Sequence, residues 1–104
     1  GGSTPETGFG CSGYVCWVYN QNGYNVGRTT ANGLWQKSQH ISEAEAKPGD
    51  LVFFKGTYDT PGMSHCGIYL GNGMMVSAGD PIKYANIHSS YWQQYLAGFG
   101  RLSK

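Results

Sequence analysis

The chain has 104 residues, of which 12% are charged, and its formal net charge is +1. This length suits one compact domain, and the charge excludes the strong basic excess of nucleic-acid binders and membrane-surface proteins. No apolar run approaches the roughly 20 residues that a membrane-spanning helix needs, so we expect no membrane insertion. The 17 glycines and the 14% of aromatic residues predict a folded chain with many turns.

The first part of the chain predicts two helices. Residues 3–10 are expected to form a loop, and a helix is expected from Cys11 to about Asn22. The apolar stripe of this helix has three- and four-residue spacing and consists of Tyr14, Val15, Val18 and Tyr19. Gly23 fits a helix stop, and Thr30 is a capping residue type. A second, short helix is therefore expected to begin near Thr30 and to include Leu34 and Trp35.

The rest of the chain predicts short strands. They are expected at Leu51–Phe54, His65–Leu70, Met74–Ala78, around Ile82–Ala85 and at Phe99–Leu102. Residues 55–64 read as a polar loop, and Tyr91–Leu96 as a helical turn. Gly71-Asn72-Gly73 fits a tight hairpin turn, because these residues tolerate positive φ. Helices followed by an antiparallel meander define an α+β fold.

Cys11 stands at the start of the first predicted helix, between Gly10 and Ser12. A thiol at a helix N-terminus lies near unpaired N–H groups and the positive end of the helix dipole, and both favour the reactive thiolate. The amides of Cys11 and Ser12 could also stabilise a developing oxyanion. The alternative is that Cys11 is a small buried apolar residue, which is the common role of a free cysteine.

His65 begins a predicted strand and is the candidate base for Cys11. On a strand, His65 shares one face with Gly67 and Tyr69, whereas Cys66, Ile68 and Leu70 share the other. The second set is apolar, so we interpret Cys66 as a core residue. A cysteine nucleophile needs an imidazole within hydrogen-bond reach, which His65 would supply. The alternative is a histidine that only ends a strand.

The remaining cysteines and histidines do not predict a metal site. There are three cysteines, and an odd number argues against a closed disulfide framework. The further candidates for ligands are Cys16, Cys66, His40 and His88, and they show no Cys-x-x-Cys or His-x-x-x-His spacing. We therefore expect no metal and no cofactor. Core packing is also favoured over a stacking surface for Tyr91, Trp92 and Tyr95.

Three blocks together resemble the NlpC/P60 cysteine peptidases, which have a papain-like core. The blocks are Gly8-Phe9-Gly10-Cys11-Ser12-Gly13, Pro48-Gly49-Asp50-Leu51-Val52-Phe53-Phe54, and the run from His65 to Gly73. The family's C-termini are similar to Tyr91-Trp92 and to Gly98-Phe99-Gly100-Arg101 in this chain. The run looks closest to the hydrolases carried by conjugative elements of Gram-positive bacteria.

The resemblance implies an activity and assigns roles to residues. It implies hydrolysis of peptidoglycan stem peptides, typically between D-γ-glutamyl and a diamino acid, by a secreted or cell-wall-associated monomer. Cys11 matches the nucleophile, His65 the base, and Ser12 a residue that lines the substrate site. Residues 1–104 would then form a single catalytic domain that is truncated at its N-terminus, without a tyrosine that the family carries upstream. Stem peptide is the expected partner, and nucleic acid is not.

Two positions within the chain depart from the family's pattern. Gly10 stands where the family has an aspartate, which in some members helps to hold the free amine of the substrate. Ser77 stands at the third catalytic position, which is normally His, Asn or Gln, and Asp80 and His88 are alternatives for that role. Three hypotheses remain: a cysteine endopeptidase, a catalytically impaired wall-binding module of the same fold, and an amidase or acyltransferase that uses the same pair.

Overall fold

The computed structural model describes residues 3–4, 8–9, 11–57, 59, 61–77 and 83–103, with side chains described from Ser12 onward. Three parts of the predictions above lie outside the described residues. They are the side chain of Cys11, the position of Gly10, and the segment 78–82, which contains Asp80.

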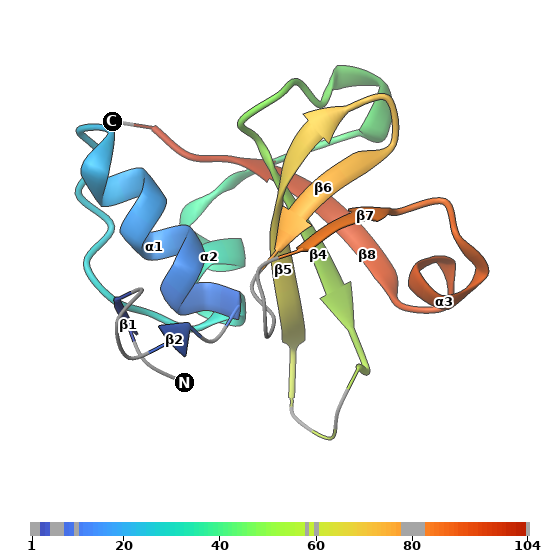
Figure 1. Ribbon diagram of the computed structural model, residues 1–104, viewed down its shortest axis with the longest axis horizontal. Coiled ribbons are helices and arrows are strands. Elements are labelled where there is room, and N and C mark those ends of the chain that lie inside the picture. Colours follow the sequence, from blue (N-terminus) through green and yellow to red (C-terminus); the bar gives the residue numbers. More distant parts are fainter. Residues whose placement is uncertain are drawn as a thin grey trace.

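Two helices pack on one face of an antiparallel sheet (Figure 1). The first, α1 (Cys11–Gln21), ends before Gly23, whose φ of 86° favours glycine. The second, α2 (Ala31–Lys37), is capped by Thr30, whose side-chain oxygen accepts a hydrogen bond from the N–H of Gly33 at 3.0 Å. Both predicted helices are confirmed. None of the described helices is long and apolar enough to cross a membrane.

The sheet has six strands in the order β3-β8-β4-β5-β6-β7. They are β3 (Gln39–Ile41), β4 (Leu51–Lys55), β5 (Met63–Gly71), β6 (Met74–Ser77), β7 (Lys83–Asn86) and β8 (Leu96–Arg101). Every neighbouring pair is antiparallel. In the turn between β5 and β6, Asn72 and Gly73 have φ values of 53° and 78°, as the predicted hairpin requires. The α+β class and the meander β4-β5-β6-β7 are therefore confirmed.

The structure corrects the prediction in four places. Residues 3–10 were expected to form a loop, but they contain two paired two-residue strands, β1 (Ser3–Thr4) and β2 (Gly8–Phe9). Strand β3 and the 3-10 turn η1 (Glu43–Glu45) were not expected. The helical turn is the shorter α3 (Ser90–Gln93), because Leu96 already pairs with β4. Finally, β8 does not continue the meander but lies between β3 and β4.

The sheet separates two apolar clusters. The cluster beneath α1 and α2 includes Cys66 and Ile68 of β5. The cluster on the opposite face includes Phe54 and Tyr69. The partly buried residues that pack against it are Ile41, Ala46, Ala85, Trp92, Tyr95 and Leu96. Residues 65–69 of β5 therefore alternate between the two faces, as the sequence predicted. Leu70 was expected in the apolar set, but it is 38% exposed, at the point where the pairing of β5 with β6 becomes irregular. Cys66 is fully buried beneath the helices, which confirms its interpretation as a core residue.

A buried carboxylate ties the turn before β4 to the last strand. Asp50 accepts hydrogen bonds from Arg101 Nε at 3.0 Å and Arg101 Nη2 at 2.7 Å, and from the N–H of Lys47 at 2.8 Å. Burial raises the pKa of Asp50, but these hydrogen bonds and the nearby positive charges outweigh burial, so its pKa lies below the ordinary value. Arg101 also donates to the carbonyl of Glu45.

Candidate functional site

Cys11 is the first residue of α1, at the end of the helix where backbone N–H groups lack helical partners. Ser12 is half-buried, and its hydroxyl accepts a hydrogen bond from Arg28 Nη1 at 3.2 Å. The same guanidinium nitrogen donates to the carbonyl of Thr29 at 2.5 Å. The positive charge of Arg28 therefore lies at the positive end of the α1 dipole. Both contributions favour a thiolate over a thiol at the first position of this helix.

The start of α1 is joined to the start of β5 by the segment that enters α2. The sulfur atom of Cys16 in α1 lies 3.9 Å from the carbonyl oxygen of Thr29. Asn32 in α2 accepts a hydrogen bond from the backbone N–H of Met63 at 3.0 Å. Both helices contact β5, and the start of α1 lies closer to the sheet than its other end in Figure 1. The elements that carry Cys11 and His65 are therefore neighbours.

His65 lies in β5 directly opposite Phe54 of β4, on the face of the sheet away from the helices. Its ring centroid is 5.1 Å from that of Trp92 in α3, and the two rings are nearly parallel, with an angle of 24° between their planes. The Phe54 ring is tilted against it, with centroids 5.8 Å apart. The Nε2 atom of His65 is buried and has no hydrogen-bond partner among the described residues. Such an atom needs an explanation, because almost all buried polar groups are paired.

Ser77 lies near His65 but is not bonded to it. The pairing of Ile68 with Val76 places Ser77 beside Gly67, on the face that carries His65. A Cβ atom at Gly67 would lie 3.4 Å from the Cβ of Ser77, so the two strands approach closely here. Ser77 is 5% exposed, yet Nε2 of His65 has no partner there. Ser77, the predicted third catalytic residue, thus lies on the same face of the sheet as His65 but forms no hydrogen bond with its Nε2 atom.

His88, an alternative for the third role, lies elsewhere. Its Nε2 atom is 2.5 Å from a carboxylate oxygen of Glu43, and its ring is next to Gly73 in the turn after β5. His65 is six residues before the end of β5, which corresponds to a distance of roughly 20 Å along the strand. His88 is therefore excluded as a partner of His65.

The other residues considered as metal ligands have separate environments. His40 stacks on Trp35 with ring centroids 3.4 Å apart, and its Nε2 atom lies 2.9 Å from the Trp35 carbonyl oxygen. Cys16 and Cys66 are buried and form no disulfide. Among the described residues, no three His, Cys, Asp or Glu side chains lie close enough together to hold a metal ion.

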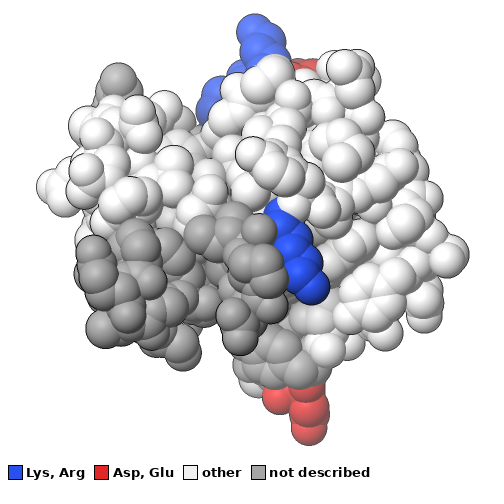
Figure 2. Space-filling model, viewed as in Figure 1, with Lys and Arg blue, Asp and Glu red and all other residues white. Residues whose placement is uncertain are grey.

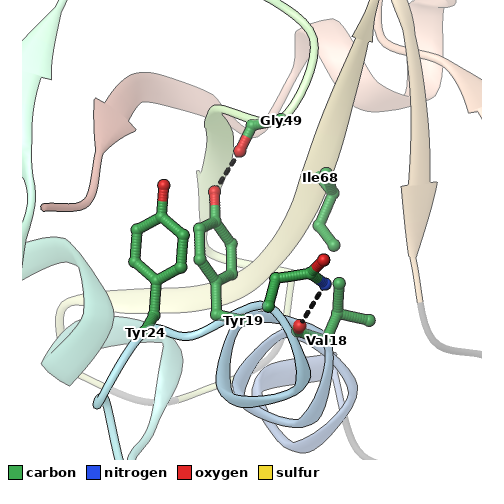
Figure 3. A pocket seen from close by; sticks show the side chains of 6 residues that line it. Val18, Tyr19, Tyr24, Gly49 and Ile68 are labelled. Atoms are coloured by element: carbon green, nitrogen blue, oxygen red, sulfur yellow. Dashed lines mark hydrogen bonds between the residues drawn. The ribbon is translucent and has the colours of Figure 1, made fainter. Parts of the chain in front are cut away.

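The hollow drawn in Figure 3 lies at the far end of α1. It encloses about 170 Å³ and is lined by Val18, Tyr19, Asn22, Tyr24, Gly49 and Ile68. The hydroxyl of Tyr19 donates to the carbonyl of Gly49 (Figure 3). Burial, followed by the neighbouring Tyr24, raises the pKa of Tyr19, so this hydroxyl keeps its proton. Val18 is seven residues beyond Cys11, which is about 10 Å along the helix, so this hollow is separate from the candidate site.

Charged side chains are sparse on the face seen in Figure 2. The described part of this face is mostly uncharged, with basic and acidic groups scattered singly. A surface of this kind produces no broad electrostatic field.

Comparisons with known proteins identify the family. The NlpC/P60 family profile matches residues 1–101, and the chain belongs to this family. It is 48% identical over 103 residues to the bifunctional muramidase/DL-endopeptidase CwlT of Bacillus subtilis. It is 50% identical over 103 residues to the probable endopeptidase p60 of Listeria monocytogenes. These alignments cover 98% of this chain but only 31% and 20% of the two relatives.

A solved structure from Staphylococcus aureus, described as similar to a lipoprotein of the NLP/P60 family, has the same fold. Its TM-score is 0.94 at 41% identity, and the match covers 100% of this chain and 35% of that one. The chain therefore spans only about a third or less of each of these three proteins. The resemblance that the sequence motifs carried is confirmed for the family and for the fold.

Proposed function

We propose that residues 1–104 form the catalytic domain of a peptidoglycan hydrolase that cuts stem peptides with a Cys11–His65 pair. The observation that carries this proposal is the unpartnered, buried Nε2 of His65, on a strand next to the helix that begins at Cys11. A structural histidine at this depth would be expected to have a hydrogen-bond partner. The names of the relatives, DL-endopeptidase and endopeptidase, support the same reaction class.

The reaction would proceed through an acyl-enzyme. His65 takes the thiol proton, and the Cys11 thiolate attacks the carbonyl carbon of the scissile peptide. Backbone amides at the start of α1 stabilise the oxyanion that forms. The C–N bond then breaks as His65 returns the proton to the leaving amine, which leaves a thioester on Cys11. A water molecule attacks the thioester, with His65 again taking a proton, and the free carboxylate and thiol are released.

The proposed substrate bond lies between D-γ-glutamyl and a diamino acid. This bond follows from the family resemblance and agrees with the name of the DL-endopeptidase from Bacillus subtilis. Ser12 and the guanidinium of Arg28 border the start of α1, so they would face the part of the substrate next to the nucleophile. We further propose a monomer that acts outside the cell or in the cell wall, without a cofactor.

The test is digestion of purified muropeptides by the wild-type chain and by Cys11→Ala and His65→Ala variants. We expect soluble products from the wild type and none from either variant. Mass spectrometry identifies the new termini: a free γ-carboxyl on D-glutamate indicates the endopeptidase. A stem peptide cut away from the glycan would indicate an amidase, and a newly joined peptide an acyltransferase. Undiminished hydrolysis by Cys11→Ala would disprove the mechanism.

A second candidate function is a wall-binding module that has lost catalysis. The observation in its favour is the absence of a hydrogen bond between Ser77 and His65. Loss of the group that orients a catalytic imidazole lowers turnover by about 10⁴ in serine proteases. This candidate predicts that the chain sediments with intact sacculi but releases no peptide from them.

A further inference from the structure

We propose that Trp92 is a positioning residue, which holds the imidazole of His65 by stacking in place of the hydrogen-bonding third residue of a triad. This inference rests on the proposed function, because it gives His65 the role of the base. A catalytic imidazole is normally oriented by a hydrogen bond to the nitrogen that does not face the nucleophile. We assign Nε2 as the nitrogen that does not face Cys11, and it is buried without a hydrogen-bond partner among the described residues, so the ring contacts are the described interactions that can orient the imidazole.

The contacts that the structure describes for the ring are aromatic. Trp92 lies nearly parallel to His65, with 24° between the planes and 5.1 Å between the centroids. Phe54 packs against both of them, 5.8 Å from His65 and 4.7 Å from Trp92. A parallel stack restricts rotation of the imidazole about its Cβ–Cγ bond, and Phe54 on the adjacent strand restricts movement of the whole side chain.

The same stack favours the charged intermediate. When His65 takes the proton of Cys11, the ring becomes an imidazolium next to the face of an indole, the most effective aromatic partner for a cation. The centroid distance of 5.1 Å is within the range of about 6 Å over which this attraction acts. Trp92 would thus stabilise the thiolate–imidazolium pair as well as orient it.

Trp92 is itself held in place. It is half-buried against the cluster that contains Phe54 and Tyr69, and it belongs to α3 (Ser90–Gln93). Tyr91 packs edge-on against it, with centroids 4.9 Å apart and an angle of 86° between the planes. Tyr91 therefore helps to fix Trp92 and is not a neutral control. Tyr84 in β7 is 73% exposed and is not among the described ring contacts of His65 or Trp92, so its replacement by leucine is the control.

The test compares three variants of the full chain: Trp92→Phe, Trp92→Leu and Tyr84→Leu. Phenylalanine keeps an aromatic face, whereas leucine fills apolar volume without one. From the strength of aromatic and cation–π contacts, we expect Trp92→Leu to lower kcat about tenfold with KM unchanged within about twofold. Trp92→Phe should stay within about threefold of the wild type, and Tyr84→Leu should have the kcat of the wild type. The midpoint of urea denaturation shows whether each variant is folded under the assay conditions. If Trp92→Leu is not folded, Trp92→Met is used in its place.

A second measurement does not depend on turnover. The rate at which iodoacetamide alkylates Cys11 at about pH 6, followed by mass spectrometry of the Cys11 peptide, reports the thiolate that the pair maintains. The alkylation rates of the variants should follow the same order as their kcat values. Equal kcat and equal alkylation rates for Trp92→Leu and Trp92→Phe would overturn the proposal, and so would a wild-type Cys11 no faster than a free thiol. Rapid alkylation that depends on Trp92, without any hydrolysis of muropeptides, would uphold the positioning role and reject the proposed function.

Discussion

The hydrogen bonds of Asp50 predict a large and pH-dependent contribution to stability. Asp50 is 6% exposed and receives two hydrogen bonds from Arg101 and one from the N–H of Lys47. Asp50→Asn keeps the shape but removes the charge and turns an amide N–H₂ group toward the donors of Arg101. Hydrogen bonds to charged groups are worth about 1.5–3 kcal/mol each. Because the Arg101 side chain is 39% exposed, water replaces part of this, and we expect a net loss of about 2–3 kcal/mol.

Urea denaturation followed by tryptophan fluorescence measures this loss, and a thermal scan should show a fall in Tm of about 10–20 °C. The exposed Asp59 provides the control, since Asp59→Asn removes the same charge from the surface and should change stability by less than about 0.5 kcal/mol. The pKa of Asp50 is lowered in the folded state, so its contribution is complete above the unfolded value of about 3.9. It disappears as the pH falls through the folded pKa.

The difference between wild type and Asp50→Asn should therefore be full at pH 7 and shrink below about pH 4. A difference that stays constant from pH 7 to pH 2 would show that shape, not charge, explains the effect. A difference below about 0.5 kcal/mol at pH 7 would refute the reasoning from the hydrogen bonds, because buried pairs that lose one partner are strongly destabilised.

Two further substitutions test the site and the far end of α1. Ser77→Asn offers an amide oxygen to the unpartnered Nε2 of His65, so we expect kcat against muropeptides to rise by about threefold or more. The loss of kcat caused by Trp92→Leu should also be smaller when Ser77→Asn is present. An unchanged kcat, both in the wild type and in the Trp92→Leu variant, would contradict this. Tyr19→Phe removes the hydroxyl that donates to the turn before β4, and urea denaturation should show a loss of about 0.5–1.5 kcal/mol. Hydrolysis should be unaffected by Tyr19→Phe, because that hydroxyl lies far from Cys11.

The elements that the sequence predicted correctly are those with strong local signals. The apolar stripe of α1, the capping threonine of α2 and the glycines of the β5–β6 turn each act over a few residues. The position of β8 was not predictable in this way. Its place between β3 and β4 depends on pairing with residues about 45 to 60 positions earlier in the chain, for which the local pattern carries no signal.

The motif Pro48-Gly49-Asp50 shows how a resemblance and a physical reason differ. The sequence supplied the motif and the similar C-terminal run that ends in Arg101, but it gave no reason for either. The structure joins them, because the Asp50 carboxylate binds the Arg101 guanidinium across β4 and β8. Two blocks that appear independent in the sequence are thus one interaction, which fixes the inserted strand β8 against its neighbour.

The candidate site shows the same division between local and long-range information. Strand alternation predicted that His65 and Cys66 point to opposite faces, and the structure agrees. The sequence pattern also placed Ser77 on the strand that follows β5. The register between β5 and β6 brings Ser77 to the face of the sheet that carries His65. It did not predict a contact between His65 and Trp92, which is 27 residues further along the chain. The sequence linked Trp92 only to the family's C-termini and to packing in the core. Trp92 does pack there, and its second face is free to stack on the imidazole.

This double role explains how the chain could function with serine at the third position. A hydrogen bond orients an imidazole through one atom, whereas stacking orients it through the whole ring and leaves the distal nitrogen without a partner. The described site has the second arrangement: an unpaired Nε2, a nearly parallel indole and a phenyl ring on the adjacent strand. If stacking is sufficient, Ser77 is not a sign of lost catalysis, and the endopeptidase is favoured over the binding module. The Trp92→Leu and Ser77→Asn variants together decide between these two interpretations.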